Sequence, residues 1–162
     1  MLSGPCLVLG DDVNTDVIAP GQYLTLWDEL GKHVFEGLGK DHPALAARST
    51  FVVAGRNFGS GSSREQAVMA IQQAGVKCVI AESFARIFFR NAINRALLVL
   101  EARVEAKTGD ELEVDPSTGA IRNVTTGNSW TARPLPEAAR RIVEDGGLIE
   151  HLNKRLERER QG

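Results

Sequence analysis

The chain has 162 residues, of which 43% are hydrophobic and 25% charged, and it carries a net charge of −2. This composition is typical of one globular domain without a disordered bias, and it offers no excess of positive charge for binding nucleic acid or an anionic membrane. The N-terminus lacks a basic leader, and no stretch approaches the roughly 18 apolar residues of a membrane span. We therefore expect a cytoplasmic protein folded as a single domain over residues 1–162.

The two cysteines, Cys6 and Cys78, each lie within an apolar run, where we expect buried free thiols. No Cys-x-x-Cys pair occurs, and the three histidines show no ligand spacing. We therefore expect no metal or iron–sulfur ligand set in this chain itself.

The N-terminal part predicts a buried strand over residues 7–9, ended by Gly10, and a polar loop over residues 11–16. The side chains of this loop can bond to their own backbone in a turn, or they can face a ligand cleft. Residues 21–48 mix glycine, proline and histidine without a firm period. We expect a flexible lid here, with one short helix around residues 27–34, because long irregular loops are uncommon unless they are functional.

The central stretch of the chain is residues 51–65, FVVAGRNFGSGSSRE. A β-branched apolar run leads into a turn that contains Gly55, Gly59 and Gly61, and we expect a helix to begin at Ser62. Glycine lets a ligand approach the main chain, and the first turn of a helix offers unpaired N–H groups and a partial positive charge. This stretch predicts a strand, an anion-binding loop and a helix.

Ser62 and Glu65 also have the spacing of a capping box, a purely structural arrangement in which the serine caps the helix and the glutamate reaches back. Three features favour an anion site instead: the upstream glycines, a second hydroxyl in Ser63 and a cation in Arg64. A cation at a helix N-terminus is unfavourable unless an anion lies nearby. We therefore interpret the loop as an anion site.

Residues 67–74 have helical spacing and residues 77–81 predict another strand, so residues 51–81 form a strand–helix–strand unit typical of a parallel sheet. The glycine-rich turn then lies at the carboxyl end of its strand. In open α/β sheets this edge is where ligands bind.

The second half of the chain continues an α/β pattern. Ser83 has the position of a helix cap, and Phe84, Ile87, Phe88 and Ala92 share one helical face. The opposite, polar face can be solvated or can form a wall of the site. The expected elements are a helix over residues 84–95, a strand over 97–100, a hairpin of strands 111–114 and 120–124, helices over 137–145 and 148–156, and a frayed tail over 157–162.

Three segments resemble those of a known family: GDDVNTDVI over residues 10–18, AGRNFGSGSSRE over residues 54–65 and SFARIFFRN over residues 83–91. They are similar to the swivelling domain of the aconitase superfamily, within the group of free-standing small subunits of 3-isopropylmalate dehydratase and homoaconitase. The likeness covers about residues 3–155. It implies a single swivelling β/β/α domain with a parallel strand–helix–strand core and a C-terminal hairpin and helices.

The resemblance also implies a hydro-lyase that moves a hydroxyl group between neighbouring carbons of a hydroxy-acid through an unsaturated intermediate. In this family a separate large subunit binds the catalytic four-iron four-sulfur cluster, and the small subunit closes over it. The implied partners are that large subunit and a small hydroxy-di- or tricarboxylic acid. The sequence leaves open whether the isolated chain forms a homo-oligomer.

Carried onto this sequence, the resemblance assigns roles to three residues of the glycine-rich stretch. Ser62 matches the family's catalytic serine, which removes a proton from carbon as an alkoxide. Ser63 matches a neighbour that contacts the substrate. Arg64 matches an arginine that binds a substrate carboxylate through its planar fork.

The same resemblance places Thr25, Leu26 and Trp27 in the short loop that contacts the variable group of the substrate. Leu26 and Trp27 favour an apolar group such as isopropyl, and no arginine is present to bind the extra carboxylate of homoaconitate. We therefore expect the 3-isopropylmalate reaction of leucine biosynthesis, with homoaconitate or a dimethylmalate-type substrate as alternatives. Two positions depart from the family pattern: Gln66 replaces the usual histidine and Ser60 a frequent cysteine.

Other classes of protein fit the motifs less well. A phosphate- or nucleotide-binding module would use the same glycine loop, but the chain lacks the Gly-Lys-Ser/Thr of a P-loop and the Gly-x-Gly-x-x-Gly of a dinucleotide site. A serine hydrolase would need Gly-x-Ser-x-Gly, which is absent. Retention of Ser62, Ser63 and Arg64 disfavours a scaffold subunit without catalysis.

Overall fold

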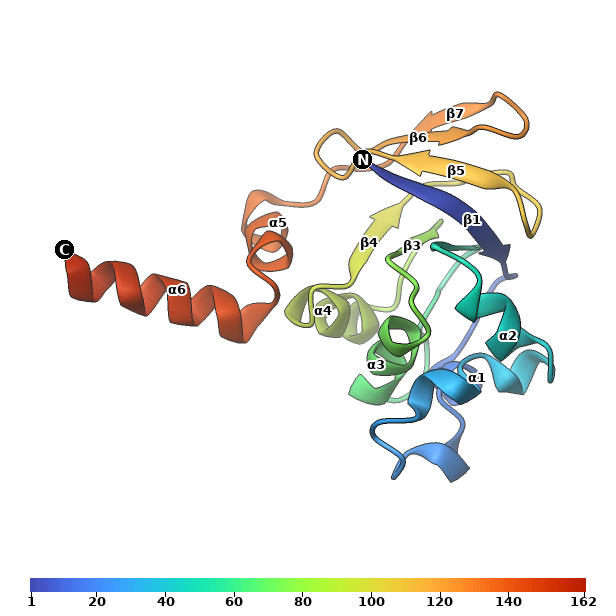
Figure 1. Ribbon diagram of the computed structural model, residues 1–162, viewed down its shortest axis with the longest axis horizontal. Helices are drawn as coiled ribbons and strands as arrows, with labels where there is room; N and C mark the ends of the chain where they lie inside the picture. The colour runs from blue at the N-terminus through green and yellow to red at the C-terminus, as the bar shows by residue number, and fades with distance from the viewer.

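The computed structural model describes residues 1–162 and is built on one seven-stranded sheet in the order β4-β3-β2-β1-β5-β6-β7 (Figure 1). Strands β1 to β4 are parallel, and β5, β6 and β7 continue the sheet from β1 in antiparallel fashion. The strands are β1 (Leu2–Val8), β2 (Phe51–Ala54), β3 (Cys78–Ala81), β4 (Leu98–Glu101), β5 (Glu111–Val114), β6 (Ala120–Asn123) and β7 (Ser129–Thr131).

Strand β1 joins the two halves of the sheet. Residues 6–8 pair in parallel with β2, whereas residues 2–5 pair antiparallel with β5. The sequence predicts only the end of this strand, because Gly4 and Pro5 interrupt the apolar run that marks it. The short strand β7 is also missed, since only Trp130 is apolar among its three residues.

The helices include short elements in the N-terminal part and longer ones after it. Helix α3 lies between β2 and β3, and α4 lies between β3 and β4, which confirms the predicted strand–helix–strand unit. The helical elements are α1 (Thr15–Ile18), η1 (Gly21–Tyr23), η2 (Leu30–His33), η3 (Glu36–Leu38), α2 (His42–Ala47), α3 (Glu65–Gln73), α4 (Arg86–Asn94), α5 (Glu137–Glu144) and α6 (Leu148–Gln161).

Alternate residues of the parallel strands face two separate cores. Val52 and Val79 belong to the larger core, which the helices cover, and Phe51 and Cys78 belong to a smaller core on the opposite face. The antiparallel strands supply Leu112, Val114 and Ile121 to the smaller core, so this half of the sheet curls over that face. The α/β class and the predicted hairpin of β5 and β6 are therefore confirmed, and alternate residues of this hairpin are buried.

Three local expectations are wrong. Helix α4 begins at Arg86 with no side-chain cap, because Ser83 instead accepts a hydrogen bond from the Asn57 amide (2.8 Å). Phe84 forms a bridge with Phe58 before the helix starts, and Ile87 is 49% exposed. Phe88 and Ala92 of the predicted face are buried, together with Ile93. Residues 157–161 continue α6 as a helix rather than a frayed tail.

Helix α6 is the most detached element of the fold and extends away from the sheet in Figure 1. Its apolar residues Ile149, Leu152 and Leu156 are all exposed. No helix in the structure is both long and apolar enough to cross a membrane.

The lid region is more ordered than the sequence suggests. The expected helix around residues 27–34 is the single 3-10 turn η2, and Leu30, Val34 and Phe35 are buried. The Tyr23 ring stacks on His33 with a centroid separation of 3.6 Å. These contacts fix the segment against the body of the domain.

Candidate functional site

The two polar loops identified in the sequence lie against each other at the carboxyl ends of β1 and β2. The Thr15 amide donates to the Ser60 carbonyl over 2.8 Å, and the Gly59 amide donates to the Val13 carbonyl over 2.7 Å. Because β1 and β2 are parallel neighbours, their following loops meet at one edge of the sheet. This edge is where the sequence placed the anion-binding loop.

Two glycines shape the turn of this loop. Gly59 has φ of +82°, and a Cβ at this position would overlap the ring of Phe88. Gly61 has φ of +100°, and a Cβ here would lie 3.2 Å from Oγ1 of Thr15. Both positions favour glycine because the left-handed region is unfavourable for other residues.

The turn presents Ser62 as an exposed residue with one side-chain contact. Its Oγ lies 3.2 Å from Oγ1 of Thr15, which is only 2% exposed. The expected helix start at Ser62 and the capping-box alternative are both wrong: α3 begins at Glu65, its N-cap is Arg64 without a side-chain bond, and Glu65 pairs with Arg95 at 3.0 Å. The Ser62 hydroxyl is thus not used to close the helix.

The main chain around Ser62 is rich in free donors. None of the backbone amides from Ser62 to Gln66 donates a hydrogen bond to another group of the chain. These amides lie in the turn before α3 and in its first residues, where the helix dipole adds a partial positive charge. The arrangement can stabilise an anion, either a ligand carboxylate or an alkoxide on the serine.

Arg64 forms an ion pair with a carboxylate of the same chain. Its Nη1 forms an ion pair with Oδ1 of Asp16 and lies 3.4 Å from the carbonyl oxygen of Ala19. The other guanidinium nitrogens have no partner within the chain, so they can bind a carboxylate without breaking this pair. The aspartate explains how a cation is tolerated at the start of α3.

A second layer of polar contacts supports the two loops. Asp11 accepts hydrogen bonds from the Arg56 amide (2.7 Å) and guanidinium (3.2 Å), and these bonds lower the pKa of Asp11 below its ordinary value. The close approach of Asp11 requires glycine at position 55, since a Cβ there would overlap its carboxylate. The Asn57 side chain donates to Asp12 over 3.0 Å.

The structure does not bring Thr25 and Leu26 into contact with the turn that carries Ser62 (residues 59–64), which we call the serine turn. Gln73, at the C-terminal end of α3, donates to the Trp27 carbonyl (2.6 Å) and accepts from the Gly31 amide (3.0 Å). Helix α3 has nine residues and is about 13 Å long, so this anchor lies at the opposite end of the helix from Ser62. Leu26 is 39% and Trp27 50% exposed, which leaves both side chains open to a partner or ligand.

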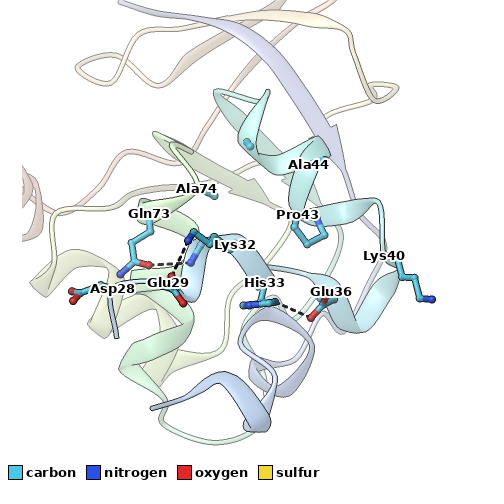
Figure 2. Close-up of a pocket in the computed structure, with 12 residues that line it drawn as sticks. Asp28, Glu29, Lys32, His33, Glu36, Lys40, Pro43, Ala44, Gln73 and Ala74 are labelled. Atoms are coloured by element: carbon cyan, nitrogen blue, oxygen red, sulfur yellow. Dashed lines mark hydrogen bonds and ion pairs between the residues drawn. The ribbon is translucent and has the colours of Figure 1, made fainter. Parts of the chain in front are cut away.

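A cavity of about 570 Å³ lies at that far end of α3, away from the serine turn (Figure 2). Figure 2 shows Lys32 paired with Glu29 and His33 with Glu36, at 2.8 and 3.2 Å. Lys32 and Glu29 therefore neutralise one another, and Ser62, Ser63 and Arg64 do not line the cavity. The unpaired amides lie at the serine turn instead.

The chain has no evident ligand set for a metal cluster. No group of three or more histidine, cysteine, aspartate or glutamate side chains is close enough together to hold a metal ion. Cys6 and Cys78 are both buried free thiols, as predicted, and burial raises the pKa of Cys6 to about 11 and that of Cys78 further. The residues present do not fit an iron–sulfur cluster.

This chain is similar to proteins named as small subunits of 3-isopropylmalate dehydratase and homoaconitase. Residues 41–105 match the family described as the aconitase C-terminal domain. The 3-isopropylmalate dehydratase small subunit of Methanosarcina acetivorans is 50% identical over 159 residues, covering 94% of this chain and 97% of that one. The methanogen homoaconitase small subunit of Methanothermobacter thermautotrophicus is 49% identical over 150 residues, covering 91% and 88%.

A solved structure agrees with these matches. The crystal structure of 3-isopropylmalate dehydratase from Methanocaldococcus jannaschii has a TM-score of 0.93 at 41% identity and covers 99% of this chain and 98% of that one. The fold is therefore that of an aconitase-type swivelling domain. The chain belongs to the aconitase C-terminal domain family, and within it to the free-standing small subunits of the 3-isopropylmalate dehydratase and homoaconitase group.

Sequence reasoning missed the partners of the site residues. The sequence left open whether the loop over residues 11–16 bonds to its own backbone or faces a ligand cleft, and it did not pair Thr15 with Ser62 or Asp16 with Arg64. The only signal in the sequence was that a threonine and an aspartate, Thr15 and Asp16, follow the strand β1. Contacts across some 47 residues of sequence are set by the neighbouring strands β1 and β2.

Proposed function

We propose that this chain is the small subunit of a two-chain cytoplasmic hydro-lyase that isomerises 3-isopropylmalate by dehydration and rehydration. The observation that carries the proposal is the exposed Ser62 hydroxyl within a turn of free amides, two residues before Arg64. The relatives named 3-isopropylmalate dehydratase small subunit support the reaction class. We infer that the partner is a large subunit that holds the four-iron four-sulfur cluster, since the relatives are named as small subunits.

In this proposal Ser62 moves the proton. As an alkoxide it removes a proton from a substrate carbon, the electron pair of that C–H bond forms the double bond, and the hydroxyl group leaves the neighbouring carbon with its bonding electrons. A serine hydroxyl is a weak acid in water, so the free amides from Ser62 to Gln66 and the charge of Arg64 must stabilise the alkoxide. Removal of one such donor commonly costs about 2.7–4 kcal/mol of barrier.

Arg64 and Ser63 hold the substrate while the proton moves. The unpaired guanidinium nitrogens of Arg64 suit a carboxylate, which they can bind through two parallel hydrogen bonds. Ser63 is exposed next to Ser62 and supplies a further hydroxyl. A carboxylate fixed in this way orients the neighbouring carbon toward the serine.

Thr25 and Leu26 select the variable group of the substrate. Exposed apolar surface at Leu26 and Trp27 favours isopropyl over a carboxylate. The chain is as similar to a homoaconitase small subunit as to the isopropylmalate enzymes, so homoaconitase is the second candidate. This loop lies at the far end of α3 from Ser62, so the proposal requires the loop to move toward the serine turn when the large subunit binds.

The test is an anaerobic reconstitution of this chain with its large subunit, offered isopropylmalate, homocitrate and dimethylmalate. We expect formation of the conjugated double bond from isopropylmalate, and only when both chains are present. Leu26→Arg should lower kcat/KM for isopropylmalate, whereas Leu38→Arg, which changes an exposed leucine on η3, should not. No turnover of any substrate by a stable complex with an intact cluster would reject the proposal.

A further inference from the structure

The hydroxyl of Thr15 is a buried polar group with a single side-chain partner. Thr15 is 2% exposed, so solvent does not reach it, and its Oγ1 lies 3.2 Å from Oγ of Ser62. No other hydrogen bond of this hydroxyl exists in the structure. Buried polar groups are almost always hydrogen-bonded, so this contact decides where the Thr15 proton points.

The donor of this hydrogen bond follows from the burial of the two residues. If Ser62 donated, the proton of Thr15 would be buried without an acceptor, which is costly. If Thr15 donates, every group is satisfied, because the exposed Ser62 can direct its own proton to solvent or to a ligand. Thr15 is therefore the donor and Ser62 the acceptor.

The backbone holds Thr15 firmly in place. Its amide donates to Ser60 over 2.8 Å, and its carbonyl accepts from the Ala19 amide over 2.9 Å. Asn14 caps this turn by accepting from the Val17 amide over 3.0 Å. Threonine is β-branched and has few χ1 rotamers, so the direction of its hydroxyl is well defined.

The serine turn packs against the hydroxyl of Thr15. A Cβ at Gly61 would come within 3.2 Å of Thr15 Oγ1 and 3.8 Å of the Thr15 backbone nitrogen. Ser62 itself is exposed and makes no other side-chain hydrogen bond within the chain. Without Thr15, nothing in the chain would fix the rotamer of Ser62.

We propose that Thr15 is the positioning residue of Ser62: its buried hydroxyl orients the serine and donates to the oxygen when that oxygen is an alkoxide. The inference rests on the proposed function for its catalytic meaning. An alkoxide can only accept, and a hydrogen bond to an ionised acceptor is about twice as strong as a neutral one. Thr15 keeps its own proton throughout, so the proton taken from carbon resides on Ser62 alone.

The first test uses the reconstituted two-chain enzyme with isopropylmalate. Thr15→Val removes the hydroxyl but keeps the shape, and it should fold because the site is buried and Ser62 stays solvated. We expect kcat to fall on the order of 10- to 100-fold with KM nearly unchanged, and the acid limb of the kcat–pH profile to move to higher pH. Thr15→Ser, which keeps the hydroxyl, should restore both.

Three outcomes of this first test would overturn the inference. One is a Thr15→Val enzyme with wild-type kcat and pH profile. Another is a Thr15→Ser enzyme as impaired as Thr15→Val, which would assign the effect to packing. The third is a Thr15→Val effect that persists unchanged in a Ser62→Ala background.

The second test needs neither the large subunit nor turnover, and so separates this inference from the proposed function. Ser62→Cys introduces a thiol whose pKa can be read from the pH dependence of its alkylation by iodoacetamide, since Cys6 and Cys78 are buried. Adding Thr15→Val should raise the pKa of that thiol by about one, and Thr15→Ser should not. Equal thiol pKa values in Ser62→Cys alone and in Ser62→Cys combined with Thr15→Val or Thr15→Ser would overturn the inference even if the enzyme is active. A raised pKa with an inactive enzyme would uphold the contact and reject the proposed function instead.

Discussion

Asn57 donates a hydrogen bond from Nδ2 to Oδ1 of Asp12 over 3.0 Å, and both residues have left-handed backbone conformations, with φ of 58° and 55°. Such values are uncommon outside glycine, although asparagine and aspartate tolerate them best. The pair joins the loop after β2 to the loop after β1. It therefore holds the loop that carries Thr15 against the turn that carries Ser62.

This pair predicts an ordering of two substitutions at position 57. Asn57→Ala and Asn57→Gly both remove the hydrogen bond, but only alanine is strained by positive φ, at a cost of about 1–2 kcal/mol. Glycine loses about 0.4–1 kcal/mol through the freedom of the unfolded chain. We expect urea denaturation to show a lower free energy of unfolding for Asn57→Ala, by up to about 1 kcal/mol. A less stable glycine variant would contradict this reading of the backbone.

The contact between Gly59 and Phe88 predicts a steric effect at the base of the serine turn. In Gly59→Ala the new methyl group meets the Phe88 ring, which packs on Phe58 at a centroid separation of 5.1 Å. Gly75→Ala is the matched control, because φ is +98° there and no atom lies within 4 Å. Both variants carry backbone strain, so the steric term should make Gly59→Ala less stable by a further 1–3 kcal/mol or so. Equal denaturation midpoints would show that Phe88 moves aside freely.

Arg64 should be sensitive even to replacement by lysine. Lysine keeps the charge but loses the planar fork, so Arg64→Lys should reduce kcat/KM of the reconstituted enzyme by about 10- to 100-fold, mainly through KM. Arg95→Lys is the control, since Arg95 contacts Glu65 and Gln72 of α3 rather than Asp16. Similar kinetics for the two variants would remove Arg64 from the carboxylate site.

Asp110 predicts a pH effect on stability. Hydrogen bonds from the Lys107 amide (3.0 Å) and from the buried Asn123 side chain (2.9 Å) lower its pKa below the ordinary value of 3.8. A carboxyl whose pKa is lowered by folding stabilises the protein above its unfolded pKa, and this contribution is lost as pH falls through the folded pKa. Asp110→Asn should therefore be less stable than wild type at pH 7, and the difference should shrink below about pH 3.8.

The control for this effect is Asp28→Asn, which alters an exposed carboxylate without a hydrogen bond in the structure. Its stability relative to wild type should show little change between pH 7 and pH 3. Thermal unfolding at a series of pH values measures both variants. A pH-independent difference for Asp110→Asn would mean that the loss is one of packing rather than of the carboxylate charge.

The sequence predicted those helices and strands whose formation depends on residues close together in the chain. The buried runs of β2 and β3 and the glycine turn between them are contiguous, so strand, loop and helix follow from residues 51–81 alone. The helix caps failed because Ser62 and Ser83 have long-range partners, Thr15 and the Asn57 amide, that compete with capping. Spacing along the chain does not show such competition.

Part of the candidate site could likewise be predicted from neighbouring residues, and part depends on tertiary structure. The residue types of Ser62, Ser63 and Arg64 and the glycines before them already indicated an anion site, because those features lie within one turn. The pairing of Asp16 with Arg64 depends on which strands are neighbours, and the position of Leu26 depends on the anchor that Gln73 supplies. Both are decided by tertiary structure.

The most direct test of the central claim is the turnover of isopropylmalate by the reconstituted two-chain enzyme with Ser62→Ala. Ser117→Ala is the matched control, since Ser117 is exposed in the hairpin turn and bonds only to Asp115. The Ser62→Ala and Ser117→Ala variants should both fold and bind the large subunit. We predict that Ser62→Ala lowers kcat about 10²–10⁴-fold or more while Ser117→Ala leaves it unchanged. A Ser62→Ala enzyme with near-normal turnover would contradict the assignment of Ser62 as the base.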